Sequence, residues 1–258
     1  MLEIFLFTKN EIDFIETFVN KNLPIADKMT IIDNGSTDGT WQKLLQLMSS
    51  QTDKINVIKH TEPFQHKARI LTKYMRRSEA KVLIPLDTDE IIAYETDDGL
   101  VTTDAVIIRN HLLDLSKLDN GKLKIKQVYN FIPNSNNYFA LDQHNKFIFL
   151  HSDFDSVDTG SHRGQTITQN GTVHRTNLVY LHFHFRSFET WLKSTQQKLK
   201  ARLGDNWNNI EVLSQYKKPR PSYHIALEYI NYLQSREWPN LQPHKQINHN
   251  IEICQKKY

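Results

Sequence analysis

Along the first 110 residues, apolar positions follow two periods in turn, and these predict alternating strands and helices. Residues 2–8, 29–33, 55–60, 81–87 and 105–110 are short apolar runs typical of buried strands. Apolar side chains instead recur with helical spacing in residues 11–22, in the segment that follows residues 36–38, and in residues 65–77. This β-α-β order predicts a Rossmann-like α/β fold, with a mostly parallel central sheet flanked by helices.

The pattern changes after residue 110. Short strand-like pieces follow one another up to about residue 185, and we expect them to form an antiparallel extension of the same domain. Residues 188–203 and 222–236 are predicted helices, joined by a loop over 204–221. The predicted organisation is therefore one domain over residues 1–190 and a C-terminal helical extension over residues 191–258.

Composition limits the class of protein. The 258 residues are 39% hydrophobic and 24% charged, as in an ordinary soluble protein. No apolar run approaches the roughly 20 residues that span a bilayer, and the first residues lack the features of a signal peptide. The single cysteine, Cys254, excludes an internal disulfide and a cysteine-based zinc site. We therefore expect a cytoplasmic protein.

The charge is unevenly spread. Residues 191–258 hold 11 Lys and Arg against 5 Asp and Glu, whereas the whole chain has a net charge of only +3. This basic tail is either a solvated surface or a peripheral contact with the anionic inner face of the membrane. The acidic segments DTDE and ETDD crowd the expected cleft, so we do not expect nucleic acid as a partner.

The strongest chemical signal is the acidic segment that directly follows the strand at 81–87. If this strand continues, Asp87 and Asp89 point the same way, because alternate residues of a strand share a face. Two neighbouring carboxylates repel unless a cation lies between them, and Mg²⁺ or Mn²⁺ takes oxygen ligands. The pattern predicts a divalent metal site; the structural alternative is a capping cluster at a strand-to-helix turn.

A second polar segment, Asp33-Asn34-Gly35-Ser36-Thr37-Asp38, follows the strand at 29–33. In any fold it is a strand-turn-helix connection with an N-cap. Asp33 at the strand tip could also accept the imide N–H of uracil. Neither a G-x-G-x-x-G nor a GKS/GKT motif is present, which argues against dinucleotide-binding and P-loop proteins.

Together these motifs resemble the GT-A glycosyltransferases of family 2. The resemblance rests on D-N-G-S-T-D-G-T after one apolar strand and L-D-T-D-E-I about 50 residues later. The branch similar to family 92 is favoured by Lys9-Asn10-Glu11. Two further segments match the family pattern: Gln65-His66-Lys67-Ala68-Arg69 and His182-Phe183-His184-Phe185-Arg186-Ser187. The resemblance covers about residues 2–200.

The resemblance implies roles for individual residues. A nucleoside and diphosphate pocket would be lined by Thr8, Glu11, Asp33, Asn34, Arg69, Asp87 and Thr88. The metal, Mn²⁺ or Mg²⁺, would be held by Asp87, Asp89 and His182, with His184 as the alternative histidine. The implied reaction moves a sugar from a UDP-sugar to a glycan or lipid-linked acceptor, and the resemblance favours inversion.

The catalytic base of family 2 is not recognisable in this sequence. Asp153, Asp155, Asp158 and His162 are the candidates, although a merely soluble loop explains the aspartates as well. Two other functions compete. A nucleotidyltransferase that makes nucleotide-sugars would need a glycine-rich loop, and residues 4–11 contain no glycine. A nucleic-acid-binding protein would need basic and aromatic side chains gathered on one face.

Overall fold

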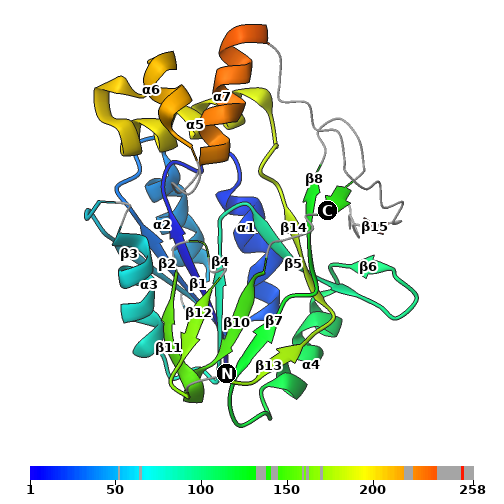
Figure 1. Ribbon diagram of the computed structural model, residues 1–258. Helices are drawn as coiled ribbons and strands as arrows, with labels where there is room; N and C mark the ends of the chain where they lie inside the picture. Colours follow the sequence, from blue (N-terminus) through cyan, green and yellow to red (C-terminus); the bar gives the residue numbers. More distant parts are fainter. Residues whose placement is uncertain are drawn as a thin grey trace. The chain divides into compact units, whose positions relative to one another are not determined.

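The larger of two units is built on a seven-stranded sheet (Figure 1). The computed structural model describes residues 1–51, 53–63, 66–131, 138–140, 145–158, 160, 163–168, 171–217, 223–236 and 251–252. The strands of this sheet lie in the order β13 (Val173–Arg175), β7 (Lys122–Lys124), β10 (Phe147–Leu150), β4 (Val82–Leu86), β1 (Leu2–Thr8), β2 (Lys28–Asp33) and β3 (Ile55–Lys59).

Four of these strands are parallel and place their carboxyl ends together. β1 pairs with β2 and β4, and β2 pairs with β3, all in parallel. β10 runs antiparallel to β4, so it begins beside the end of β4 and ends beside its start. The predicted Rossmann-like, mostly parallel core is confirmed.

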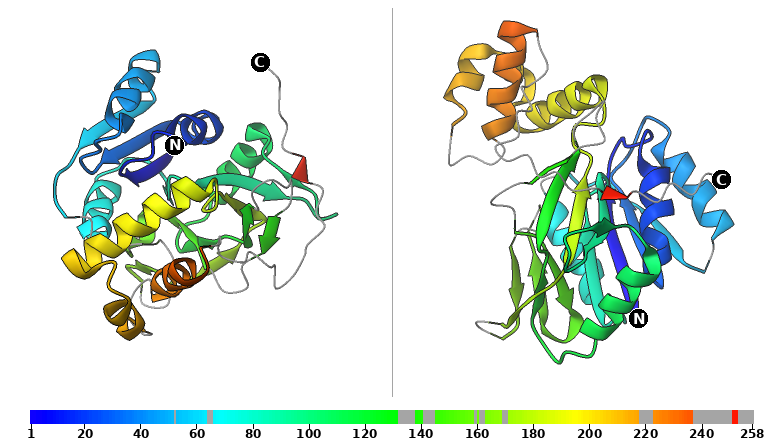
Figure 2. Two further views of the ribbon diagram at one scale, coloured as in Figure 1. Left: turned by 90° about the horizontal axis from the view of Figure 1, so that it is seen from above. Right: turned by 90° about the vertical axis from the view of Figure 1, so that its right-hand side faces the viewer.

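Helices cover both faces of this sheet (Figure 2). On one face, apolar side chains of α1 (Ile15–Asn22), α2 (Thr40–Ser50) and α4 (Ala105–Leu115) share a core with β1, β2 and β4; the short 3-10 helix Leu23–Ile25 joins them. On the other face, α3 (Lys67–Arg76) and β11 (Phe154–Val157) pack on the aromatic side chains of β1 and β10. β11 pairs with β12 (Gly164–Thr166), after the 3-10 turn His151–Asp153.

The strand predicted over 105–110 is wrong, because these residues begin α4. The carboxylate of Asp104 accepts hydrogen bonds from the backbone N–H groups of Val106 and Ile107 and so caps the helix. Ile108 and Leu112 are buried four residues apart, whereas Val106 is 67% exposed. A short apolar run does not distinguish a strand from a helix without this capping information.

A second sheet carries the predicted antiparallel extension. Its order is β15 (Ile251–Glu252), β6 (Val101–Thr102), β5 (Glu90–Glu95), β14 (Leu178–His182), β8 (Gln127–Phe131) and β9 (Tyr138–Ala140). β5 and β14 are antiparallel, with Leu178 opposite Tyr94 and His182 opposite Glu90. This pairing brings a histidine to the first residue of β5.

A side chain of α1 takes the place of a strand beside the start of β5. The pairing of β6 with β5 involves Tyr94 and Glu95, near the end of β5. At the start of β5, Asn22 Nδ2 donates to Glu90 O and Asn22 Oδ1 accepts from Ile92 N, both at 3.0 Å. The Asn22 side chain is fully buried, so its amide satisfies two backbone groups in the core.

The second unit contains the helices α5 (Phe188–Leu203), α6 (Ile210–Gln215) and α7 (Tyr223–Ser235). Leu199, Leu213 and Tyr229 belong to its small core. The predicted helices at 188–203 and 222–236 are confirmed, while α6 lies in the expected loop. One segment of the first unit ends at His182, and a segment of the second begins at Phe183. The predicted division at residue 190 remains a prediction. Among the described residues no helix combines the length and apolar character needed to cross a bilayer.

Candidate active site

Polar side chains meet at the carboxyl edge of the parallel strands. Thr8 ends β1 opposite Asp33, the last residue of β2, and Asp87 follows β4 directly. Thr88 Oγ1 donates to Thr8 Oγ1 at 3.0 Å, which joins the ends of β1 and β4. Ligands of open α/β sheets bind at this edge, so it is the candidate active site.

Asp33 is fully buried and uses only one of its carboxylate oxygens. Oδ1 accepts hydrogen bonds from the backbone N–H groups of Gly35 at 3.1 Å and Ser36 at 3.0 Å. Oδ2 is buried, and no donor among the described residues reaches it. A buried carboxylate oxygen without a donor is costly, so this atom is suited to accept an N–H group of a bound ligand.

The Lys9-Asn10-Glu11 segment fastens this turn to the end of β1. Asn10 has a positive φ of 57° and its Oδ1 accepts from Thr37 N at 2.8 Å. Glu11 N donates to Thr40 Oγ1, also at 2.8 Å. These bonds fix the backbone around Asp33, and the predicted ligand contact of Glu11 remains a prediction.

Asp87 lies between two buried lysines. Lys67 Nζ donates to its Oδ1 at 2.5 Å, and Lys146 Nζ donates to its Oδ2 at 2.9 Å. The side chains of Lys67 and Lys146 are 6% and 5% exposed. Burial raises the pKa of Asp87, but Lys146 and Lys67 outweigh it and hold that pKa well below its usual value. Asp87 is therefore ionised and already has its charge compensated.

Glu90 completes this buried charge cluster. Its Oε1 lies 2.9 Å from Lys146 Nζ, and its Oε2 accepts from Asp87 N at 2.9 Å. Burial is the main cause that raises the pKa of Glu90, and the charge of Asp87 adds to it. Burial lowers the pKa of Lys146, whereas Asp87 and Glu90 raise it more, so the lysine stays charged.

The acidic segment is a turn between two strands rather than the end of one strand. Glu90 N donates to Asp87 O at 3.0 Å, and β5 begins at Glu90. The expectation that strand geometry aligns Asp87 with Asp89 is therefore wrong, as is a strand-to-helix turn. The carboxylate of Asp87 is held by the lysines, and that of Asp89 meets His182.

Asp89 and His182 form a pair with the chemistry of a metal site. His182 Nε2 lies 3.3 Å from Asp89 Oδ2, and both side chains are about one-fifth exposed. Burial lowers the pKa of His182, but Asp89 outweighs it and the net direction is upward. One carboxylate and one imidazole fit a divalent cation such as Mn²⁺. His184, the alternative ligand, belongs to the second unit.

The family resemblance predicted Arg69 as a ligand contact, but the basic residue that lies beside Asp87 is Lys67, two residues earlier. Arg69 is 62% exposed and binds Glu62, whereas Lys67 is buried against Asp87. The helical period could have distinguished them, because Lys67 shares a face with the apolar Ile70 and Leu71. Gln65 lies outside the described residues. Lys146 precedes the apolar run of β10, and no motif marks it.

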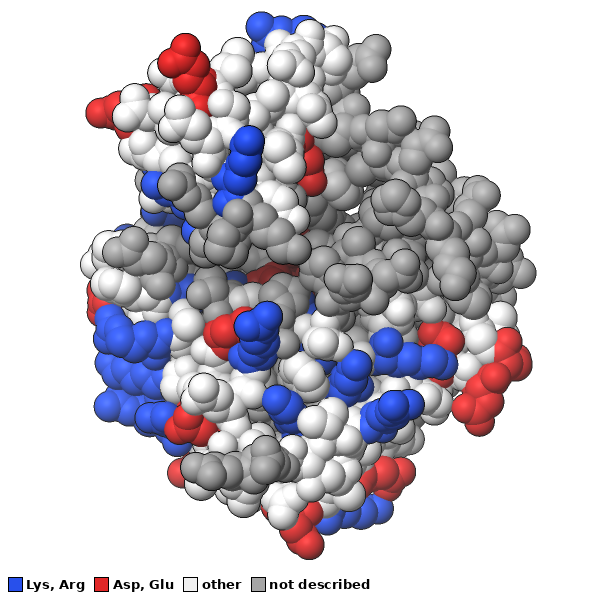
Figure 3. All heavy atoms as spheres, viewed as in Figure 1, with Lys and Arg blue, Asp and Glu red and all other residues white. Residues whose placement is uncertain are grey.

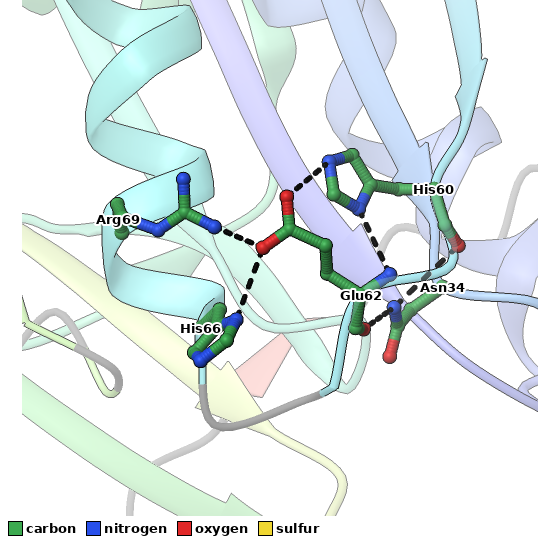
Figure 4. Close-up of polar contacts among 5 residues, drawn as sticks. All are labelled: Asn34, His60, Glu62, His66 and Arg69. Atoms are coloured by element: carbon green, nitrogen blue, oxygen red, sulfur yellow. Dashed lines mark hydrogen bonds and ion pairs between the residues drawn. The ribbon is translucent and has the colours of Figure 1, made fainter.

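Arg69 is part of a cluster centred on Glu62 (Figure 4). Arg69 Nη2 and His66 Nδ1 both meet Glu62 Oε2, the latter at 3.0 Å, and His60 Nε2 lies 3.7 Å from Oε1. His66 is the main cause that lowers the pKa of Glu62. Asn34 Nδ2 donates to Glu62 O at 2.6 Å, so this amide ties the end of β2 to the segment after β3.

The three candidate aspartates occupy different places. Asp153 is 1% exposed and accepts from Gly121 N at 3.0 Å and Thr168 N at 2.9 Å. Because β10 runs antiparallel to β4, Asp153 follows β10 at the edge opposite Asp87. Asp155 binds Arg76 near the end of α3. Asp158 Oδ1 accepts from Arg163 N at 3.1 Å, and His162 lies outside the described residues.

Of two similar solved structures, the first supports the fold class. The chain is similar to S. aureus TarS 1-349 in complex with UDP-GlcNAc, with a TM-score of 0.51, 10% identity, and coverage of 91% of this chain and 72% of that chain. It is also similar to the mannosyltransferase PcManGT from Pyrobaculum calidifontis in complex with GDP-Man and Mn²⁺, with a TM-score of 0.47, 14% identity, and coverage of 91% and 70%. The predicted GT-A fold is confirmed.

A family model matches part of the chain. Residues 3–103 match Glycosyl transferase family 2, a segment that contains most of β1 and all elements from α1 to β6. The predicted resemblance to family 2 is thereby confirmed, while the likeness to family 92 remains a prediction. No curated protein sequence matches the chain.

Proposed function

We propose that this protein is a metal-dependent glycosyltransferase that moves a sugar from a UDP-sugar to a hydroxyl group of a glycan or glycoconjugate. The observation that carries the proposal is the unpaired Asp33 Oδ2 at the same sheet edge as the Asp89–His182 pair. These two features suit the base and the diphosphate of one nucleotide. The match of residues 3–103 to a glycosyltransferase family supports this reaction class.

The hydrogen bonds of Asp33 favour uracil as the base. Uracil presents one imide N–H, whereas guanine presents two adjacent donors that match both oxygens of a carboxylate. Oδ1 of Asp33 is already occupied by Gly35 N and Ser36 N, and only Oδ2 remains. A single acceptor fits a single donor, so we propose UDP rather than GDP.

Asp89 and His182 would hold the metal ion. The bound ion would stabilise negative charge on the departing diphosphate. An imidazole ligand favours Mn²⁺ over Mg²⁺, which prefers an all-oxygen shell. Because the lysines already compensate Asp87, Asp89 is the carboxylate whose charge would meet the cation. Asp87 remains a candidate ligand through a water molecule.

The remaining catalytic role is the proton acceptor. In an inverting transfer the acceptor hydroxyl attacks the anomeric carbon while a base takes its proton. Among the aspartates, Asp153 is buried in backbone hydrogen bonds and Asp155 is bound to Arg76. We therefore propose Asp158, with His162 as a contact to phosphate or acceptor.

The test is a screen for nucleotide release from UDP-sugars and GDP-sugars, without acceptor, in Mn²⁺, Mg²⁺ or EDTA. We expect release of UDP that requires the metal. Release from GDP-sugars alone would contradict the base assignment. Equal release with EDTA would contradict the metal, and no release from any donor together with no UDP binding would reject the proposed reaction.

A further inference from the structure

The outer face of α3 gathers basic side chains. Lys73 lies four residues after Arg69 and three or four residues before Arg76 and Arg77, so these side chains follow one side of α3 and its C-cap. All four are exposed, while Ile70, Leu71 and Met75 on the opposite side are buried. Figure 3 shows basic side chains crowded on the flank where Figure 1 places α3.

This face borders a hollow of about 570 Å³ between α3 and β11. Its lining residues are Ala68, Arg69, Thr72, Lys73, Arg76, Arg77, Ser156 and Val157. We call it the α3–β11 groove. A groove with four cationic side chains and two hydroxyl groups has the chemistry of an anion site.

Hydrogen bonds between its two walls fix the groove. Arg76 Nε donates to Asp155 O at 2.7 Å, and Arg76 Nη2 donates to Asp155 Oδ1 at 2.6 Å. Val157 N donates to Thr72 Oγ1 at 3.2 Å. A preformed groove loses less conformational freedom when a ligand binds.

The groove keeps an excess of positive charge. Glu62 pairs with Arg69, and Asp155 pairs with Arg76. In the part of the chain that the structure describes, Lys73 and Arg77 have no carboxylate at ion-pair distance. Arg69 and Lys73 are like charges four residues apart, and so are Lys73 and Arg77. Such pairs destabilise a helix. The negative end of the helix dipole favours cations in the last turn, such as Lys73 and Arg76, but it does not explain Arg69 in the first turn.

We propose that the α3–β11 groove binds phosphate groups of an anionic acceptor, distant from the hydroxyl group that reacts. The proposal rests on the proposed function, because it assigns the acceptor of that same enzyme. α3 begins at Lys67, which contacts Asp87, so the groove starts beside the candidate active site. A helix of ten residues extends about 15 Å. Several units of an acceptor chain can therefore lie along it while one end reaches the donor.

Arginine and hydroxyl groups favour phosphate as the ligand. A guanidinium presents a planar fork of N–H donors that matches phosphate oxygens in pairs. Arg77 offers such a fork, Lys73 adds an ammonium group one helical turn away, and Arg76 retains N–H groups beyond the two that bind Asp155. The groove is concave, which suits a discrete chain better than a flat lipid surface.

The test compares two double charge reversals. Lys73→Glu with Arg77→Glu changes the groove, whereas Lys54→Glu with Lys117→Glu makes the same change of net charge at exposed lysines outside it. Calorimetry measures the binding of inorganic tripolyphosphate without metal, with UDP present to occupy the donor site. UDP affinity and flotation with phosphatidylglycerol vesicles are measured for all three proteins.

We expect the groove variant to lose at least about tenfold in tripolyphosphate affinity, while the control variant and all UDP affinities stay near wild type. Equal losses in both variants would show a general charge effect and overturn the groove. A wild-type protein that does not bind tripolyphosphate would also overturn it, including the case in which it binds vesicles instead. Failure of UDP binding in the wild type would contradict the donor site and leave the tripolyphosphate comparison as the test of the groove.

Discussion

Lys146 binds Asp87 through its ammonium group, 2.9 Å from Oδ2, although 59 positions separate the two residues. The contact exists because β10 begins beside the end of β4, where the acidic turn starts. With Lys67 on the other oxygen, Asp87 is held in one position before any ligand arrives. The first aspartate of the motif thus belongs to a buried charge network that also contains Glu90.

Removal of Lys146 should lower the free energy of unfolding, because the neighbouring carboxylates lose a cation. Lys146→Met leaves the buried carboxylate of Glu90 without its cation and the partly exposed carboxylate of Asp87 with one cation fewer, so we expect a loss of about 3–5 kcal/mol in urea unfolding. Adding Glu90→Gln removes one of the two charges and should restore part of the loss. Lys73→Met is the exposed control, with a change below about 0.5 kcal/mol. Wild-type stability in Lys146→Met would contradict the network.

Asp33→Asn tests the base pocket. The amide keeps an oxygen for Gly35 N and Ser36 N but places an NH₂ group where Oδ2 would accept from uracil. UDP binding should weaken by about 1–3 kcal/mol, the usual loss for a hydrogen bond to a buried charge. Calorimetry with UDP measures it, and an unchanged unfolding midpoint shows that the turn is intact. Equal UDP affinity in variant and wild type would refute the assignment.

Asp89→Asn and His182→Ala test the metal pair. Each removes one of the two donor groups that lie 3.3 Å apart, so each should weaken Mn²⁺ binding severalfold and lower UDP release. His184→Ala should do less. The measurement is Mn²⁺ titration by electron paramagnetic resonance, beside the release assay. Unchanged Mn²⁺ affinity in both Asp89→Asn and His182→Ala would reject this site.

Asp153→Asn separates a structural role from a catalytic one. Hydrogen bonds from Thr168 and backbone N–H groups outweigh burial and hold the pKa of Asp153 below its usual value. Its stabilisation is therefore present above the unfolded pKa of about 3.9 and disappears as pH falls through the lower folded pKa. At pH 7 we expect a loss of about 1–3 kcal/mol, shrinking below about pH 4, with little change in turnover per folded molecule.

Urea unfolding at pH 7 and pH 3.5 measures this loss of stability in Asp153→Asn. Asp158→Asn is the control variant. The Asp158 variant should unfold like the wild type but lose most of its transferase activity. The opposite result, a stable Asp153 variant without activity, would return the base to Asp153.

Local chemistry explains which parts of the site could be predicted from the sequence. The polar segments at Asp33 and Asp87 could be recognised in the sequence, because each follows an apolar strand directly. The strand-like pieces predicted up to about residue 185 likewise include β14, which brings His182 opposite Glu90. Such signals depend only on neighbours in the chain.

Contacts across the sheet could not be predicted in this way. Nothing near Lys146 in the sequence indicates that β10 runs antiparallel to β4, and this direction both pairs Lys146 with Asp87 and carries Asp153 to the far edge. The same limit applies to Asp87 and Asp89, whose spacing fits a strand but which form a turn closed by Glu90 N. Direction and register depend on tertiary packing.

The amide of Asn22 has a consequence for hydrogen exchange at the start of β5. It binds Glu90 O and Ile92 N inside the core, on the part of β5 that β6 does not reach. Asn22→Leu would fill similar space but leave these two buried backbone groups without that hydrogen-bond partner. The start of β5 would then open more often, visible as faster exchange of the Ile92 amide hydrogen than in the wild type.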